Sequence, residues 1–135
     1  MKFNELEVGQ FAEHTKTVTE TDVVMYAGIT GDFNPMHVNQ AYAEKTRFGG
    51  RLAHGMLTAG LISAVLGTRL PGEGSIYMSQ SLRFMRPVRI GDTITARIEV
   101  IELLPDKQRV RLATSCRNQH QEKVLDGEAL VMMQE

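Results

Sequence analysis

The feature that most constrains the fold of this chain is the segment from His54 to Leu70. It is apolar on nearly every side of a helical projection, which predicts a buried helix rather than one lying on a surface. Four of its residues are small and allow a neighbouring element to approach closely: Ala59, Gly60, Ala64 and Gly67. Pro71-Gly72 ends the segment. The rest of the chain must therefore provide the elements that cover this helix.

The residues after the helix alternate between apolar and polar side chains, as strands with one buried face do. We expect strands over residues 75–85, 93–104, 108–118 and 124–133, and an earlier strand over 11–18. In the two middle strands the predicted inward positions are Ile94, Ala96, Ile98, Val100, Val110, Leu112, Thr114 and Cys116. The last strand is apolar on much of both faces, which predicts a central strand or one covered by a subunit contact.

Two short helices are predicted between the first strand and the long helix. Thr19 and Asp22 form a capping-box pattern that begins the first helix, and Gly31 ends it. Asn39 can cap a second helix over residues 40–46. One strand, a long buried helix and four antiparallel strands make an α+β layout in which the sheet curls around the helix. This is the arrangement of the hot-dog fold, and we treat residues 1–135 as one such domain.

The loop after Gly31 carries two groups that can transfer protons near neutral pH, Asp32 and His37. They flank Asn34-Pro35, where proline fixes its own φ and keeps the preceding residue out of the helical region. A shaped loop therefore presents an acid and an imidazole together. For either residue alone a structural role is the simpler interpretation: a turn for Asp32, and a hydrogen-bonded histidine entering a helix for His37.

The composition excludes several classes of partner and site. The net charge of −1 and the lack of a basic block argue against nucleic acid or an anionic membrane as the main partner. The single cysteine, Cys116, excludes an internal disulfide and a cysteine-based zinc cage. No apolar run is long enough to span a bilayer, and the first residues lack a signal-peptide pattern. We therefore expect a cytoplasmic protein without a metal or redox cofactor.

The stretch Tyr26-Ala-Gly-Ile-Thr-Gly-Asp-Phe-Asn-Pro-Met-His37 resembles the hydratase-2 motif of the MaoC-like dehydratases. Three further stretches look like the same family: Ala53–Leu57, Gly74–Tyr77 and Arg86–Asp92. The likeness is greatest to the short (R)-specific enoyl-CoA hydratases. It implies a homodimer that acts on an acyl-CoA thioester, adding water reversibly to a trans-2-enoyl-CoA to give the (R)-3-hydroxyacyl-CoA. Polyhydroxyalkanoate precursor supply is one pathway that the family serves.

Hydration of an enoyl thioester requires a water aimed at Cβ, a proton for Cα and stabilisation of the thioester oxygen. The resemblance implies that Asp32 and His37 are the catalytic pair, acting through one shared water. The unpaired amides at the start of the long helix suit an oxyanion, and in line with the family we expect the Gly55 N–H to be the donor. Gly55 could alternatively serve only to begin the helix tightly. For the neighbouring His54, capping or packing is as plausible as catalysis.

An acyl chain needs an apolar slot, and residues of the long helix and the last strand are candidates for its wall. We expect Ser63, Leu66 and Val131 to contribute to substrate binding, with bulk at Ser63 or Leu66 setting the chain length. Leu57 and Leu61 are better explained as core residues.

Coenzyme A carries phosphates, and three arginines lie around the turn after the strand at 75–85: Arg83, Arg86 and Arg89. Arginine suits phosphate recognition, and we expect this cluster to bind substrate. For any one of them alone, a solvated strand face is the simpler interpretation.

Other functions remain possible on the same fold. A thioesterase would need a carboxylate that activates water at the carbonyl, which leaves the Asp32/His37 spacing without an explanation. A 3-hydroxyacyl-carrier-protein dehydratase would perform the same chemistry on another carrier. A non-catalytic acyl-CoA-binding subunit would not need both proton-transferring groups.

Overall fold

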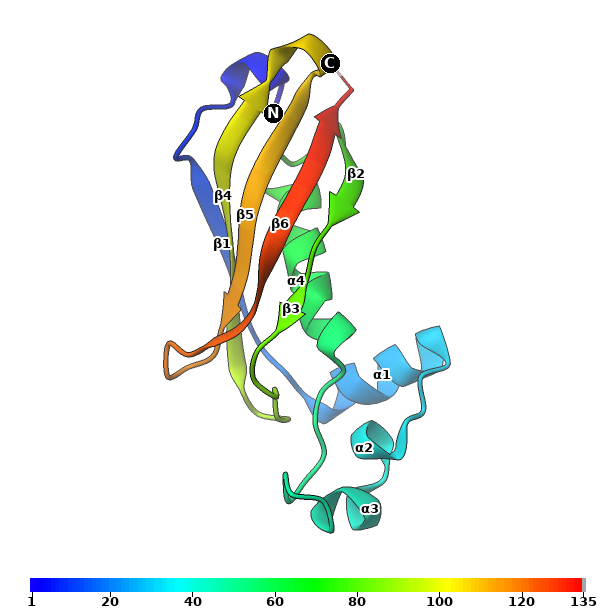
Figure 1. The fold of residues 1–135 in the computed structure, drawn as a ribbon. Coiled ribbons are helices and arrows are strands. Elements are labelled where there is room, and N and C mark those ends of the chain that lie inside the picture. The colour runs from blue at the N-terminus through cyan, green and yellow to red at the C-terminus, as the bar shows by residue number, and fades with distance from the viewer. Residues whose placement is uncertain (135) are drawn as a thin grey trace.

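A computed structural model describes residues 1–134 as one antiparallel sheet curved around a helix (Figure 1). The sheet has six strands in the order β1-β4-β5-β6-β2, and β3 also pairs with β6. In chain order the elements are η1 (Phe3–Glu5), β1 (Phe11–Thr17), α1 (Glu20–Thr30), α2 (Pro35–Val38), α3 (Gln40–Glu44), α4 (Gly55–Thr68), β2 (Ser75–Gln80), β3 (Arg83–Phe84), β4 (Thr93–Leu104), η2 (Pro105–Lys107), β5 (Arg109–Arg117) and β6 (Lys123–Met133). The α+β hot-dog prediction is therefore confirmed, with β6 as a central strand.

The core lies between α4 and the concave face of the sheet. All eight predicted inward positions of β4 and β5 are buried, as the alternation of their side chains required. From α4 the buried side chains are Thr58, Ala59, Leu61, Ile62, Val65 and Leu66. This packing places the sheet on one side of α4 along its length.

The opposite side of α4 is open, so the prediction of a helix buried all round is wrong for the single chain. Gly60, Ser63, Ala64 and Gly67 are exposed and follow one another at helical spacing. The six strands of one chain curve around a single side of the helix, and small residues line the side that they leave uncovered.

The strand predicted over residues 75–85 is broken in the middle. β2 ends at Gln80, and Ser81 and Leu82 cross to β3, while a register shift between Tyr77 and Ser79 bends the first half. This connection between β2 and β3, Ser81 and Leu82, is called the crossover below, and it passes directly over Gly127 of β6. The continuous alternation that we expected along this segment is therefore wrong, and apolar side chains of both halves are exposed, including Tyr77 in β2 and Phe84 in β3.

The three short helices lie beyond one end of the sheet, next to the start of α4 (Figure 1). The Thr19/Asp22 capping box is formed as predicted, and Gly31 ends α1 in the left-handed conformation at φ 82°. Asn39 caps α3 through its side chain. α2 was not predicted: the Asn34 side chain accepts from the Met36 N–H, and Pro35 takes the first helical position. The proline loop is therefore a short capped helix that holds His37 in place.

Candidate active site

Asp32 lies in the exposed connection between α1 and α2, and its carboxylate position is set by local hydrogen bonds. Its N–H donates to Thr30 Oγ1 at 3.2 Å, and the Asn34 N–H donates to Asp32 Oδ1 at 3.3 Å. One carboxylate oxygen is thus held by the loop backbone, and the other has no such restraint among residues 1–134. Asn34 therefore orders the loop through its backbone N–H and its side-chain cap.

His37 has a defined tautomer. Its Nδ1 lies 2.7 Å from the backbone oxygen of Leu52. A carbonyl oxygen can only accept, so Nδ1 carries the hydrogen, and in the neutral ring Nε2 keeps its lone pair. His37 is half-buried on α2 with an acceptor nitrogen available, which is the state that a general base requires.

His54 joins the pair, a position to which sequence reasoning gave no definite role. It precedes α4 and is only 2% exposed. Its Nε2 lies 3.0 Å from the backbone oxygen of Asp32, and its ring stacks on that of His37 with centroids 3.9 Å apart. The ring of Tyr26 of α1 also packs against the His54 ring, with 4.6 Å between the ring centroids. The sequence feature that could have indicated a role for His54 is its position next to Gly55, the predicted oxyanion donor.

Asp32, His37 and His54 converge on one small volume. One nitrogen or oxygen atom from each lies within 4.8 Å of the others. Such a set can surround a water molecule, and two imidazoles with a carboxylate are also donors that a divalent metal accepts. One nitrogen of each ring already faces a backbone carbonyl, which leaves one free nitrogen on each. The prediction that no metal is required stays a prediction.

A cavity of about 530 Å³ opens beside this cluster. Its wall includes Asp32, His37, His54, Gly55 and Thr58, together with apolar side chains of the β3 region and β6. Gly55 is the first residue of α4, so its N–H has no acceptor within the helix. A Cβ on Gly55 would lie 2.6 Å from Cε1 of Phe84, so the glycine leaves the space that the ring occupies. The predicted donor therefore borders the same cavity as the predicted acid–base pair.

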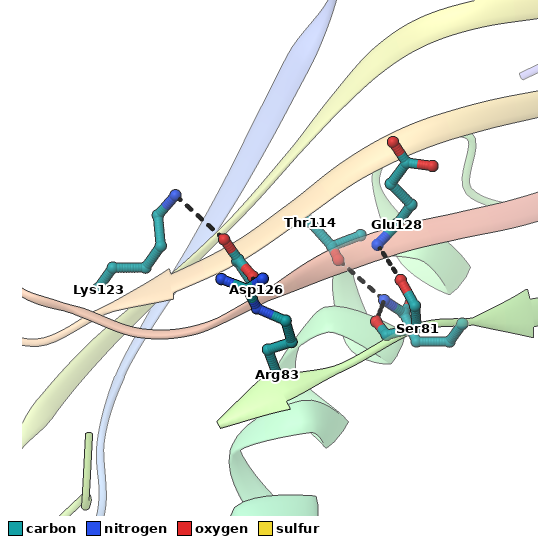
Figure 2. Close-up of polar contacts among 7 residues, drawn as sticks. Ser81, Arg83, Thr114, Lys123, Asp126 and Glu128 are labelled. Carbon is teal, nitrogen blue, oxygen red and sulfur yellow. Dashed lines mark hydrogen bonds and ion pairs between the residues drawn. The ribbon is translucent and has the colours of Figure 1, made fainter. Parts of the chain in front are cut away.

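The three predicted arginines do not all gather at the cavity. Arg86 lines it and pairs with Glu122 at 3.2 Å. A hydrogen bond from Asn118 and the charge of Arg86 lower the pKa of Glu122. Arg83 points to Asp126 at 3.8 Å on β6, as Figure 2 shows. Arg89 does not line the cavity. Its backbone forms an isolated β-bridge with Leu52, which does line it.

Arg47 and Phe48 belong to the cavity wall, although sequence reasoning gave them no role. They precede the glycine pair at 49–50, and the Arg47 guanidinium stacks on the Phe48 ring at 4.7 Å. Arg47 and Arg86 are therefore the two arginines that border the cavity in the part of the chain that the structure describes.

The predicted acyl-slot residues lie elsewhere. Leu66 and Val131 are buried in the core, and Ser63 is on the open side of α4. None of the three lines the cavity described above within residues 1–134. Their role in substrate binding stays a prediction, as does the selection of chain length by bulk at Ser63 or Leu66.

Cys116 is fully buried, and its Sγ faces the backbone oxygen of Thr58 at 3.9 Å. Burial raises the pKa of its thiol to about 12. The thiol is therefore protonated at neutral pH and is a core side chain rather than a nucleophile.

A hot-dog protein with a carboxylate–imidazole pair beside the first amides of its long helix is the class that the fold and the site define. The chain belongs to the MaoC like domain family, whose profile matches residues 4–123. It is 55% identical to a 3-hydroxybutyryl-CoA dehydratase of Methylorubrum extorquens, across 96% of this chain and 82% of that protein. It is 52% identical to an (R)-specific enoyl-CoA hydratase of Rhodospirillum rubrum, across 97% of this chain and 90% of that protein.

Among solved structures, the chain is similar to an R-hydratase of Pseudomonas aeruginosa in its unliganded form. The TM-score is 0.95 at 51% identity, with 99% of this chain and 86% of that chain covered. These similarities confirm the family resemblance and the assignment to the hydratases and dehydratases, which are hydro-lyases.

Proposed function

We propose that this protein is an (R)-specific enoyl-CoA hydratase that adds water reversibly to a trans-2-enoyl-CoA. The observation that carries the proposal is the convergence of Asp32 and His37 at a cavity bordered by Gly55. An acid–base pair beside unpaired amides meets all three requirements of the reaction. The stereochemistry and the CoA carrier rest on the relatives at 52–55% identity.

In the proposed reaction a water lies between Asp32 and His37 with its oxygen toward Cβ of the substrate. The pair removes one proton as the new C–O bond forms, and electrons of the C=C bond shift toward the thioester oxygen. The Gly55 N–H stabilises the negative charge on that oxygen. The pair then returns a proton to Cα, so that water is added with no net change in the enzyme.

The first test is the ultraviolet absorbance of crotonyl-CoA. Hydration removes the conjugated enoyl thioester, so we expect its absorbance band to fall without release of free thiol. Thiol release detected with a disulfide reagent would instead indicate a thioesterase. A chain that binds the thioester but changes neither signal would be a binding subunit, and either result would reject the proposal.

The proposed oxyanion donor can be tested by removing a single backbone hydrogen. Pro suits the first position of a helix, and the extended backbone of His54 is compatible with a following proline. Gly55→Pro removes the N–H, and Gly55→Ala adds similar bulk against Phe84 but keeps the N–H. We expect kcat of the proline variant to be about 100-fold below that of the alanine variant. Equal kcat values for the two variants would show that this N–H does not stabilise the reaction.

Arg47 and Arg86 border the cavity, where they can meet the phosphate groups of the coenzyme A that the relatives indicate as the carrier. Part of the Arg86 charge is already compensated by Glu122, which makes Arg47 the less restrained of the two. Within residues 1–134 no helix is both long and apolar enough to cross a membrane. A cytoplasmic location and a part in polyhydroxyalkanoate supply are consistent with this function and remain predictions.

A homodimer is part of the proposal. β2 is an edge strand, and it exposes Tyr77 by 43% and Met78 by 41%. The open side of α4 with its small residues is also exposed. Exposed apolar side chains on a free strand edge are suited to pairing with a second copy.

Replacing Ile76 and Met78 together by Lys should dissociate the dimer because it places two charges on the proposed contact edge. We expect sedimentation velocity to give a dimer for the native chain and a monomer for the double variant. Val8→Lys is the matched control, since Val8 is an exposed apolar residue just before β1, and β1 is at the opposite edge of the sheet from β2. A double variant that sediments with the native protein would place the contact elsewhere.

A further inference from the structure

Two buried polar atoms beside the proposed catalytic pair have no hydrogen-bond partner among residues 1–134. They are His54 Nδ1 and Thr58 Oγ1. Both side chains are 2% exposed, and both line the cavity that holds Asp32 and His37. His54 immediately precedes α4 and Thr58 follows one helical turn later, so the two come from the same end of the helix.

The hydrogen-bond partner of His54 Nε2 determines whether Nδ1 requires a donor or an acceptor. Because the Asp32 carbonyl can only accept, Nε2 carries the hydrogen, and in the neutral ring Nδ1 is an acceptor that lacks a donor. The Thr58 hydroxyl can donate and accept, and it also lacks a partner. A buried polar group without a partner is unfavourable, so each of these two atoms requires a partner at this cavity.

We propose that His54 Nδ1 and Thr58 Oγ1 are bridged by one buried water, and that this anchored imidazole is the positioning residue of the active site. A buried water requires a polar site with two or more partners, which these atoms provide. The water donates to Nδ1, and the Thr58 hydroxyl completes its hydrogen bonding. The inference rests on the proposed hydratase function only for its kinetic consequences.

His54 can position both catalytic groups at once. Its Nε2–H holds the backbone oxygen of Asp32 at 3.0 Å, and its ring stacks on His37 with planes 28° apart. The bridging water fixes the third side of the ring, so rotation of His54 is opposed from Nε2, Nδ1 and the stacked face. Displacement of a catalytic group by about 1 Å can reduce a rate by about 100-fold.

The hydroxyl is tested by Thr58→Val, which keeps the shape of the side chain, and by Thr58→Ser, which keeps the hydroxyl. We expect the valine variant to lose about tenfold in kcat and to melt at a lower temperature, because the water loses one of its partners. The serine variant should restore both values to near those of the native chain. A valine variant that melts at a higher temperature with unchanged kcat would show that the hydroxyl had no bound partner, and would overturn the proposal.

The ring is tested by His54→Gln, whose side-chain amide can still donate to the Asp32 carbonyl, and by His54→Phe, which retains only the stacking. We expect kcat to fall by about tenfold for glutamine and by about 100-fold for phenylalanine, with KM changed far less. His120→Gln is the matched control, because His120 is exposed in the turn before β6, and its kcat should be native. A phenylalanine variant that folds with native kcat would overturn the positioning role.

A readout that does not depend on activity separates this inference from the proposed function. Long-range ¹H–¹⁵N NMR of the four histidines reports which ring nitrogen carries each hydrogen. We expect His54 to be a fixed Nε2–H tautomer whose Nδ1 resonance moves in Thr58→Val and returns in Thr58→Ser. An Nδ1–H tautomer, or an Nδ1 resonance unaffected by both variants, would reject the bridge even in an active hydratase. If the native chain fails to hydrate crotonyl-CoA while the NMR result holds, the proposed function fails and the bridge stands.

Discussion

Asp32→Asn should reduce kcat for hydration of crotonyl-CoA by about 10³-fold. Asparagine keeps the size of the side chain and an oxygen that can accept from the Asn34 N–H, so the loop between α1 and α2 should keep its shape. It removes the charge and the ability to exchange a proton with the shared water. Because the change acts on the reaction rather than on binding, KM should change far less than kcat.

The control for this variant is Asp106→Asn, the same chemical change in the exposed turn between β4 and β5. Its kcat should equal that of the native chain. His37→Gln should be as damaging as Asp32→Asn, and the double variant should be little worse than either one, because two groups that act on one water are not additive. Near-native turnover in both single variants with the fold intact would remove the pair from the mechanism.

The antiparallel core could be predicted because the alternation of apolar and polar side chains is visible within each strand segment. β4 alternates as far as Val100 and β5 alternates along its length, and every position predicted to face inward is buried. The caps at Thr19 and Asn39 were equally predictable, since a capping side chain and its amide are neighbours in the sequence. The break at Ser81 and Leu82 was not, because it results from the approach of this segment to Gly127, which is 46 residues away from Ser81. Alternation within one segment carries no information about such a contact.

Some residues of the candidate site could be predicted from the sequence, and others could not. Asp32 and His37 were found because they share one short motif, and the structure brings them together as the motif implied. His54 contributes through a bond to the Asp32 backbone and a stack on His37, neither of which has a sequence pattern. The arginines show the opposite error: Arg83 and Arg86 are three residues apart, yet a strand directs Arg83 toward Asp126 and only Arg86 reaches the cavity. Proximity in the sequence of a strand therefore did not predict a shared site.

The open side of α4 illustrates a third limit. Its apolar and small residues predicted complete burial, but one chain supplies a sheet on only one side. A helix side that a second copy covers carries the same apolar and small residues as a side that is buried within one chain. The sequence alone therefore does not distinguish the two kinds of burial. In the proposed homodimer, a partner subunit can cover the exposed side chain of Ser63.

Gly127→Ala should produce the largest loss of stability, about 3 kcal/mol or more in the free energy of unfolding. A Cβ at this position would lie 1.8 Å from the backbone oxygen of Ser81, and a backbone atom cannot rotate away as a side chain does. β6 and the crossover must therefore separate. Their separation strains two bonds of 2.9 Å between Ser81 and Glu128, one from the Ser81 N–H to the Glu128 oxygen and one from the Glu128 N–H to Ser81 Oγ. Figure 2 shows the second of these bonds beside β6.

Thermal unfolding followed by circular dichroism should place the melting temperature of Gly127→Ala roughly 10 °C below that of the native chain. Gly28→Ala is the matched control: a Cβ there meets nothing within 4 Å, and Gly28 lies inside α1. In a helix that substitution should stabilise the protein by up to about 1 kcal/mol. The same added methyl group therefore has opposite effects at the two glycines, because one faces solvent and the other faces the backbone of the crossover. A Gly127→Ala variant that melts with the native chain would show that β6 and the crossover are not in contact.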